Sequence, residues 1–171
     1  MASKKKIDVV GSFLRPTFLK EARADYESGK ISKGVLTEVE DKAIRELVQK
    51  QQKSGLPFIT DGEFQRATWH LDFMWGCEGV GHNKTENGIS FHDEAALIDD
   101  TCLVGKLGVG YHPFVEHFKF VQSLEDENTK AKQTIPAPAQ FLEQLILPQN
   151  IERTLQFYPD IDAVIEDLTT V

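Results

Sequence analysis

Apolar residues along the chain fall at spacings that predict alternating helices and short buried strands. Between residues 37 and 55 they recur three and four positions apart, as Val39, Ala43, Ile44, Leu47 and Val48, which predicts an amphipathic helix. Thr37 and Glu40 form a capping box for this helix, and Gly55 supplies a left-handed stop. The apolar run 56–60 follows at once and predicts a buried strand. Helix and strand in this order are typical of a β/α repeat with parallel strands.

Two other segments predict strands of the same kind. The β-branched run 7–11 ends in glycine, and a helix at 17–28 follows it, with Gly29 as its stop. Residues 30–35 read as a connector to the next helix. Residues 131–142 predict a further strand ending in a proline-marked loop, because proline cannot donate to a central ladder. The chain therefore predicts an α/β fold.

The middle and the end of the chain follow other patterns. Glycine and short alternations at 76–91 predict a β-hairpin excursion, and the apolar stretch 102–107 pairs naturally with it. For 112–124, helix and strand are both tenable. The tail from 150 to 171 predicts one or two helical pieces, with Pro159 in the first turn of the second.

An open sheet edge is the main consequence of this arrangement. A fold of about three strands and a hairpin leaves backbone groups unpaired at the edge, which is costly. The last predicted helix also has no stop signal after Leu168. We therefore expect residues 1–171 to be one incomplete part of a larger fold, with no second domain.

Composition narrows the classes of partner. The 171 residues are 40% hydrophobic and 27% charged, which is ordinary for one globular domain. The 27 acidic and 19 basic residues give a formal net charge of -8, which argues against nucleic acid and anionic membranes as general partners. No apolar run approaches the roughly 18 residues of a membrane span, and the N-terminus lacks the apolar core of a signal peptide. We expect a soluble, cytoplasmic protein.

Cysteine and histidine residues give no metal-binding pattern. Cys77 and Cys102 are the only cysteines, and isolated cysteines in a cytosolic chain are usually free thiols. The five histidines are scattered, and the step from His112 to His117 suits neither one helix face nor a compact zinc site. The sequence therefore predicts no complete metal site within these residues.

Two acids stand where the predicted strand 56–60 ends. Asp61 and Glu63 flank Gly62, and Ser12 stands in the same way at the mouth of the first predicted strand. The carboxyl ends of parallel strands are where ligands bind in α/β folds, because strand tips and loops converge there. Asp-Gly is also a common turn dipeptide, so a plain turn accounts equally well for the spacing alone.

Three segments, Val10–Pro16, Ile59–Arg66 and Thr134–Pro138, resemble in order and separation the N-terminal half of the cobalamin-independent methionine synthase family. The resemblance covers essentially the whole chain. It is closest to the short, single-barrel, 5-methyltetrahydropteroyltriglutamate-homocysteine methyltransferase-like members. It implies a (β/α)8 TIM barrel with an inserted β-hairpin, incomplete in this chain. It also implies transfer of a methyl group from methyltetrahydrofolate to the thiol of homocysteine, which makes methionine. Zinc activates the thiol in this reaction.

The resemblance assigns substrate-binding roles at the strand ends. Gly11 and Ser12 resemble the family's loop after the first strand, whose serine helps to hold the carboxylate of the amino acid. Glu63 resembles the glutamate that pairs with the substrate's ammonium, and Asp61 is a supporting residue. These roles are chemically reasonable, because hydroxyl and amide donors suit a carboxylate and an ammonium gives a carboxylate a charge-assisted hydrogen bond.

Neighbouring residues have more than one interpretation. Arg15 and Arg66 either neutralise the acids, reach an anionic group, or form structural ion pairs. Trp69, Phe73 and Trp75 either line a wall that faces a pterin or the substrate, or make ordinary hydrophobic contacts.

The family's zinc ligands lie in the C-terminal half of the barrel, which the resemblance does not reach. They are a histidine and a cysteine close together, a glutamate and a late cysteine, and neither Cys77 nor Cys102 matches them. A free thiol of pKa about 8.5 is mostly protonated at neutral pH, so the chemistry needs the metal. We expect this chain to hold part of the substrate site and to be inactive alone.

Two alternatives stay open. A zinc-thiol transferase that acts on another thiol, such as coenzyme M, has the same fold, but coenzyme M has no ammonium to pair with Glu63. The other alternative is a non-catalytic half-barrel module for binding or assembly, including a homodimer that covers the open barrel edge.

Overall fold

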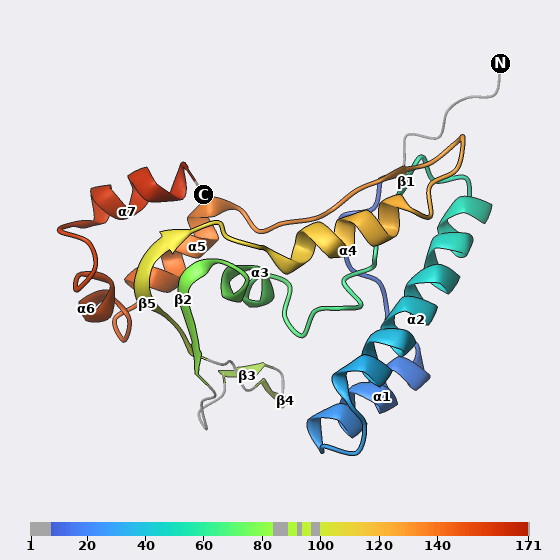
Figure 1. The fold of residues 1–171 in the computed structure, drawn as a ribbon, viewed down its shortest axis with the longest axis horizontal. Coiled ribbons are helices and arrows are strands. Elements are labelled where there is room, and N and C mark those ends of the chain that lie inside the picture. The colour runs from blue at the N-terminus through green and yellow to red at the C-terminus, as the bar shows by residue number, and fades with distance from the viewer. Residues whose placement is uncertain (1–7, 84–88, 92–93, 97–99, 171) are drawn as a thin grey trace. The chain divides into compact units, whose positions relative to one another are not determined.

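The computed structural model describes residues 8–83, 89–91, 94–96 and 100–170, which divide into two compact units (Figure 1). The first unit contains the described residues up to 67 together with 114–134. The second contains 68–113 together with the described residues from 135 onward. The expectation that the chain has no second domain stays a prediction.

The first unit contains a short parallel sheet in which a helix precedes each strand. Its elements are α1 (Thr17–Glu27), α2 (Lys33–Lys53), β1 (Phe58–Ile59), α4 (Pro113–Gln122, from Phe114 onward) and β6 (Lys130–Ala131). β1 and β6 pair in parallel, with Phe58 opposite Lys130 and Ile59 opposite Ala131. The predicted β/α order with parallel strands is therefore confirmed, and the ambiguous segment 112–124 is mostly helix.

The start of helix α2 differs from the prediction. The helix begins at Lys33, and Ser32 is its N-cap, with the serine Oγ accepting the Val35 N–H at 3.3 Å. Thr37 lies inside the helix and donates its hydroxyl to the Lys33 carbonyl at 3.0 Å. The predicted capping box is wrong because Ser32 offers an earlier cap, and this also shortens the predicted connector.

Glu40 is a buried ion-pair residue and does not cap the helix. Its side chain is 2% exposed and pairs with Arg23 at 2.9 Å and Lys33 at 3.4 Å. Burial raises the pKa of this carboxyl, against the opposing pull of both cations. Glu40 therefore ties α1 to α2 from within the unit.

The predicted apolar stripe of α2 forms the core of the first unit. Ala43, Ile44, Leu47 and Val48 are buried in one cluster with Leu19, Ile59, Phe64 and Val121. Gln51 anchors the end of β1 to this helix, because its side-chain amide donates to the Thr60 carbonyl at 2.9 Å and accepts the Thr60 N–H at 3.1 Å. The helix thus fixes the backbone immediately before Asp61.

The predicted strands are shorter or absent. Residues 8–10 form no strand, and Val10 is 91% exposed. The Lys132 side chain replaces a backbone ladder there, since Nζ binds both carboxylate oxygens of Asp8 at 2.9 Å and the Val9 carbonyl at 2.6 Å. Likewise the predicted strand 131–142 ends at Ala131, and a proline soon begins a helix instead.

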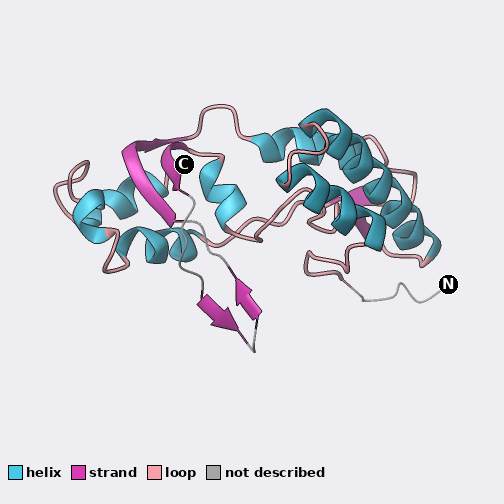
Figure 2. Ribbon diagram, turned by 90° about the horizontal axis from the view of Figure 1, so that it is seen from below, coloured by secondary structure: helices cyan, strands magenta, loops and turns pink. Residues whose placement is uncertain are grey.

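The second unit contains the predicted hairpin. Its elements are α3 (Leu71–Trp75), β2 (Glu78–Asn83), β3 (Ile89–Phe91), β4 (Glu94–Ala96), β5 (Asp100–Gly108), α5 (Pro138–Ile146), α6 (Ile151–Thr154) and α7 (Ile161–Leu168). β2 pairs with β5 and β3 with β4, both antiparallel, which confirms the hairpin excursion. All described sheets have two strands (Figure 2), so the described residues form an α/β fold without a closed barrel.

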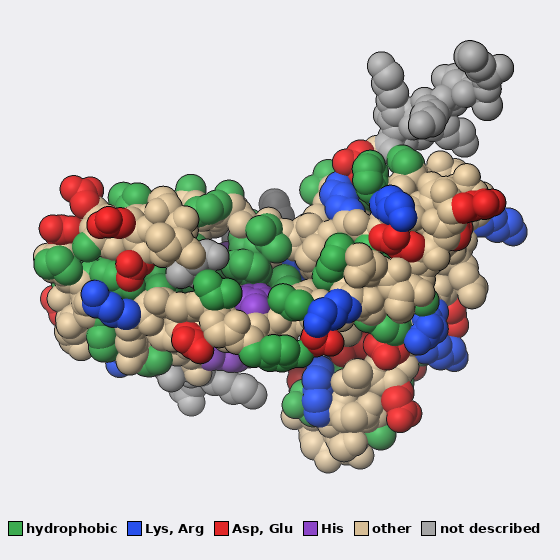
Figure 3. Space-filling model, turned by 45° about the horizontal axis from the view of Figure 1, so that its top comes forward, with side chains coloured by type: hydrophobic (Ala, Val, Ile, Leu, Met, Phe, Trp, Pro, Cys, Tyr) green, Lys and Arg blue, Asp and Glu red, His purple; other side chains and the backbone are tan. Residues whose placement is uncertain are grey.

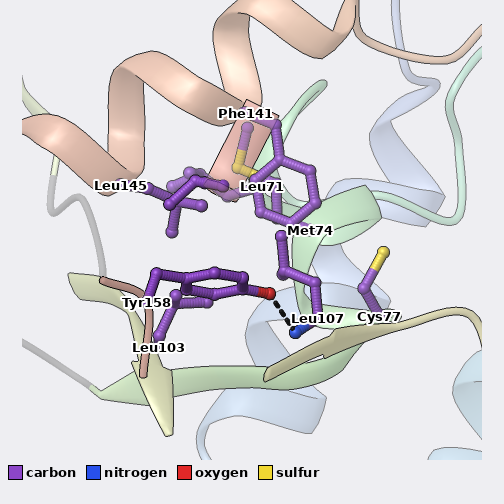
Figure 4. Close-up of a cluster of buried hydrophobic side chains, with 9 residues drawn as sticks. Leu71, Met74, Cys77, Leu103, Leu107, Phe141, Leu145 and Tyr158 are labelled. Carbon is purple, nitrogen blue, oxygen red and sulfur yellow. Dashed lines mark hydrogen bonds between the residues drawn. The ribbon is translucent and has the colours of Figure 1, made fainter. Parts of the chain in front are cut away.

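A buried cluster holds the hairpin to the helices of the second unit (Figure 4). Its labelled members are Leu71, Met74, Cys77, Leu103, Leu107, Phe141, Leu145 and Tyr158. The Tyr158 hydroxyl accepts the Leu107 N–H at 2.9 Å and donates to Asp167 at 2.7 Å. Tyr158 therefore joins β5 and α7 by hydrogen bonds inside an apolar cluster.

The end of the chain departs in detail from the prediction. Pro159 lies before α7 and not in its first turn, because Asp160 is the N-cap and its carboxylate accepts the Ala163 N–H at 2.9 Å. The helix ends at Leu168, where the hydroxyls of Thr169 and Thr170 donate to carbonyl oxygens in its last turn. The expectation of a helix without a stop is wrong because these hydroxyls satisfy carbonyls that a helix end leaves unpaired.

Basic and acidic side chains are interspersed over the first unit on the face drawn in Figure 3. Exposed pairs of this kind include Lys30 with Asp25 and Lys119 with Glu116, both at 2.8 Å. Such pairs contribute only about 0–1 kcal/mol each, so the core and the buried contacts dominate stability. No described helix has the length and apolar character needed to cross a membrane.

Truncating Leu145 should destabilise the second unit much more than truncating its neighbour. Leu145 is fully buried and Ile146 is 40% exposed. Leu145→Ala should lower the free energy of unfolding by about 2–5 kcal/mol, and the control Ile146→Ala by well under that. Tryptophan fluorescence in urea measures this directly, since both tryptophans, Trp69 and Trp75, belong to the second unit. Equal losses of unfolding free energy in the two variants would contradict the burial of Leu145 in this cluster.

Candidate functional site

The segment after β1 is a tight turn with an unusual backbone. Gly62 has φ of +67° and Glu63 has φ of +60°, and the Phe64 N–H donates to the Asp61 carbonyl at 3.3 Å. Glu63 is the one non-glycine residue with positive φ in the described part of the chain. A left-handed non-glycine residue costs roughly 1–2 kcal/mol and persists only where its surroundings hold it. The Asp-Gly dipeptide does make a turn, and that turn also presents the Glu63 side chain.

Side chains from both sides hold this turn. The Asp61 Oδ1 atom accepts the Glu63 N–H at 3.0 Å. The Arg15 Nη2 atom donates to the carbonyls of Glu63 at 2.9 Å and of Arg66 at 2.7 Å. Arg15 therefore clamps the backbone of the turn, a structural role that differs from the interpretations offered by the sequence.

The Glu63 carboxylate is held through one oxygen. Its Oε1 atom accepts the Thr134 hydroxyl at 3.1 Å and lies 3.5 Å from the Arg66 guanidinium, while the side chain is 12% exposed. A Cβ on Gly11 would stand 2.6 Å from the same oxygen, so a larger residue at position 11 would displace the Glu63 carboxylate from this place. No donor among the described residues bonds Oε2. The site thus leaves one carboxylate oxygen for a ligand.

Arg66 is a buried guanidinium that links the turn to residue 134. Its side chain is 1% exposed, and Nη2 donates to the Thr134 carbonyl at 2.7 Å. The guanidinium carbon lies 4.3 Å from the centre of the Phe114 ring, a favourable cation–π contact. Arg66 Nη1 also lies 3.5 Å from Glu63 Oε1, so Arg66 forms a structural ion pair with Glu63.

Asp61 and Ser12 differ sharply in exposure. Asp61 is 1% exposed, and its Oδ2 atom has no hydrogen-bond partner among the described residues, which is costly for a buried oxygen. Ser12 is exposed and follows Gly11, whose carbonyl accepts the Thr60 hydroxyl at 3.3 Å. The structure therefore brings Gly11, Asp61 and Glu63 together at the end of β1, with Ser12 one residue away along the chain. Their roles in binding stay predictions.

The aromatic residues proposed for a ligand wall belong to the second unit. Trp75 stacks on His82 with ring centres 3.7 Å apart and donates to the Thr101 hydroxyl at 2.9 Å. The ring centres of Phe73 and His112 lie 4.5 Å apart. Phe73 also lines an apolar pocket of about 150 Å³ with Ile135, Pro136, Ala137, Pro138, Phe141 and Leu168. The ring of Trp69 lies beside that of His70, with centres 4.4 Å apart. All three residues thus make ordinary packing contacts, and a role in a ligand wall stays a prediction.

The described residues offer no ligand set for a metal. No group of three or more histidine, cysteine, aspartate or glutamate side chains converges among them. Cys77 and Cys102 are both buried free thiols, and burial raises the pKa of the Cys77 thiol. Burial likewise lowers the pKa of His70.

Thr134 is the site residue for which the sequence analysis gave no role. The sequence predicts residue 134 inside a strand over 131–142, whereas β6 ends at Ala131 and Thr134 lies in the segment beyond it. The ends of neighbouring parallel strands lie side by side, so Thr134 comes close to the residues that follow β1.

No family model matches the chain. Two uncharacterized proteins of Bacillus subtilis, YxjG and YxjH, are each 36% identical to it over 133 residues, or 78% of this chain. The match covers 35% of each relative, so the chain spans about a third of the length of the curated relatives.

Solved structures give a more specific likeness. A Listeria monocytogenes protein described as a candidate vitamin-B12-independent methionine synthase aligns with 95% of this chain at a TM-score of 0.71 and 32% identity. The alignment covers 44% of that protein. A B12-independent methionine synthase from Shewanella sp., solved with selenomethionine, aligns with 82% of this chain and 41% of its own at a TM-score of 0.51 and 19% identity. The second likeness concerns the fold alone.

Replacing Glu63 tests the left-handed backbone. Glu63→Ala and Glu63→Gly both remove the carboxylate, but only glycine adopts positive φ without cost. The glycine variant should therefore unfold with a free energy about 1 kcal/mol higher than the alanine variant. Urea unfolding followed by circular dichroism measures the difference. An alanine variant as stable as the glycine variant would mean that residue 63 is not left-handed in solution.

Proposed function

We propose that this chain is the N-terminal part of a methyltransferase of the B12-independent methionine synthase type and forms part of its homocysteine site. The observation that carries the proposal is the Glu63 carboxylate, held at the end of a parallel strand with one oxygen left for a ligand. The Listeria likeness, at 32% identity over nearly the whole chain, supports the same family.

The chemistry of the site suits an amino acid. The substrate's ammonium would bind Glu63 through Oε2 by a charge-assisted hydrogen bond. Its carboxylate would bind the exposed Ser12 hydroxyl and nearby backbone amides. Asp61 supports this arrangement, because its Oδ1 atom accepts the Glu63 N–H at 3.0 Å and so holds the turn that presents Glu63.

The complete fold in this proposal is a (β/α)8 TIM barrel. The parallel β1–β6 pair, each strand preceded by a helix, is what two neighbouring repeats of such a barrel would supply. Methyltetrahydrofolate is the methyl donor in the proposal.

Zinc belongs to the proposed family reaction, in which it activates the substrate thiol. The described residues of this chain supply no ligand set for it, so its ligands would come from outside the described residues. The residues here bind and orient the amino acid.

Loss of the Glu63 charge should weaken homocysteine binding. A hydrogen bond to a charged group is worth about 1.5–3 kcal/mol, so Glu63→Gln should raise the dissociation constant about 10- to 100-fold. Isothermal titration calorimetry measures it, with Glu127→Gln, an exposed acid of the same unit, as the charge-matched control. Equal affinity in both variants would contradict the proposal. Binding of coenzyme M in place of homocysteine would favour the other thiol transferase.

A second candidate, an assembly module, has its own structural support. The N–H groups of Lys130 and Lys132 bond carbonyls of the β1 segment, so those of Ala131 and Gln133 face the opposite edge. Glu125 accepts the Ala131 N–H at 2.8 Å, and this bond holds the pKa of its carboxyl below the usual value. Gln133 N–H has no partner among the described residues. A strand from a second copy of this chain would pair there and cover the edge.

Gel filtration tests the assembly candidate. The chain should elute as a dimer, and Gln133→Pro should elute as a monomer, because proline removes the outward donor and keeps the bonds to β1. Gln133→Ala, which keeps the backbone N–H, is the matched control and should remain dimeric. A monomeric parent protein would rule out this dimer.

A further inference from the structure

We infer that Thr134 is a positioning residue that makes the site selective for ligands carrying an ammonium. The inference rests on the proposed function, because it concerns the same Glu63 carboxylate. Thr134 follows β6 and is half-buried, and its side chain lies between Glu63 and Arg66.

The Thr134 hydroxyl has one proton and can donate it to only one of its two neighbours. The hydroxyl lies 3.3 Å from the Arg66 Nη2 atom and 3.1 Å from Glu63 Oε1. A guanidinium only donates, so the hydroxyl accepts from Arg66 and donates to Glu63. The direction of both hydrogen bonds is therefore fixed by chemistry.

The two oxygens of the Glu63 carboxylate have different surroundings. Thr134, Arg66 and the bare Cα of Gly11 all stand against Oε1. The last torsion of a glutamate is otherwise broad, so the carboxylate would rotate freely without such contacts. Thr134 holds the carboxylate with Oε2 turned away from these groups and ready for a donor from the ligand.

Thr134 also helps to keep the ion pair between Arg66 and Glu63 long. Arg66 Nη2 is engaged by the carbonyl of Thr134 at 2.7 Å and by its hydroxyl, and Nη1 stays 3.5 Å from Glu63 Oε1. Without the hydroxyl, the guanidinium and the carboxylate could close into a tighter pair. That pair would compete with a ligand ammonium, but it would leave a ligand without an ammonium unaffected.

Two ligands and three variants test the inference by calorimetry. Homocysteine carries the ammonium, and 4-mercaptobutanoate is the same thiol acid without it. Thr134→Val and Thr134→Ala remove the hydroxyl and should weaken homocysteine binding about tenfold, the effect of one net hydrogen bond. Binding of 4-mercaptobutanoate should not change. Thr134→Ser keeps the hydroxyl and should bind homocysteine as the parent protein does.

The outcomes separate the inference from the proposed function. If a valine or alanine variant that retains the parent circular dichroism spectrum loses affinity for both ligands equally, or for neither, Thr134 does not select the ammonium and the inference is overturned. If the parent protein itself does not bind homocysteine, the proposed function fails and the inference fails with it.

Discussion

The hydrogen bonds that hold the backbone at Glu63 in a left-handed conformation are the constraint on which the site depends. The turn stores a cost of roughly 1–2 kcal/mol, which Asp61 and Arg15 offset by bonding the N–H and carbonyl of Glu63. A relaxed backbone would aim this side chain elsewhere. The strained backbone conformation of Glu63 therefore directs its carboxylate toward Gly11 and Thr134.

Packing further from the turn supports the same geometry. Gln51 on α2 bonds both backbone groups of Thr60, so the helix core positions the residue immediately before the turn. Arg66 stacks on Phe114 and bonds the carbonyl of Thr134, which connects the turn to the segment after β6. Strand ends, helix core and buried guanidinium thus fix the carboxylate together. A ligand would therefore bind a carboxylate that is already in place, without the entropy cost of ordering its side chain.

The sequence predicts the fold and the place of the site better than its details. Apolar periodicity correctly predicts the stripe of α2, and the glycine-rich alternation predicts the hairpin. The cap at Ser32 was missed because Thr37 and Glu40 offer an equally good local pattern, and only tertiary burial of Glu40 decides between them. Glu63 at positive φ opposes local propensity, so no local rule predicts it. Thr134 depends on a contact 71 residues away in the chain, which periodicity does not encode.

A crystal structure of this chain with homocysteine is the most direct test of the claim that Glu63 receives the ammonium of an amino acid. We expect the amino nitrogen within hydrogen-bond distance of Glu63 Oε2, with Thr134 still bonded to Oε1 and the ligand carboxylate near Ser12. Homocysteine bound in the opposite orientation, with its amino group remote from Glu63, would contradict the claim.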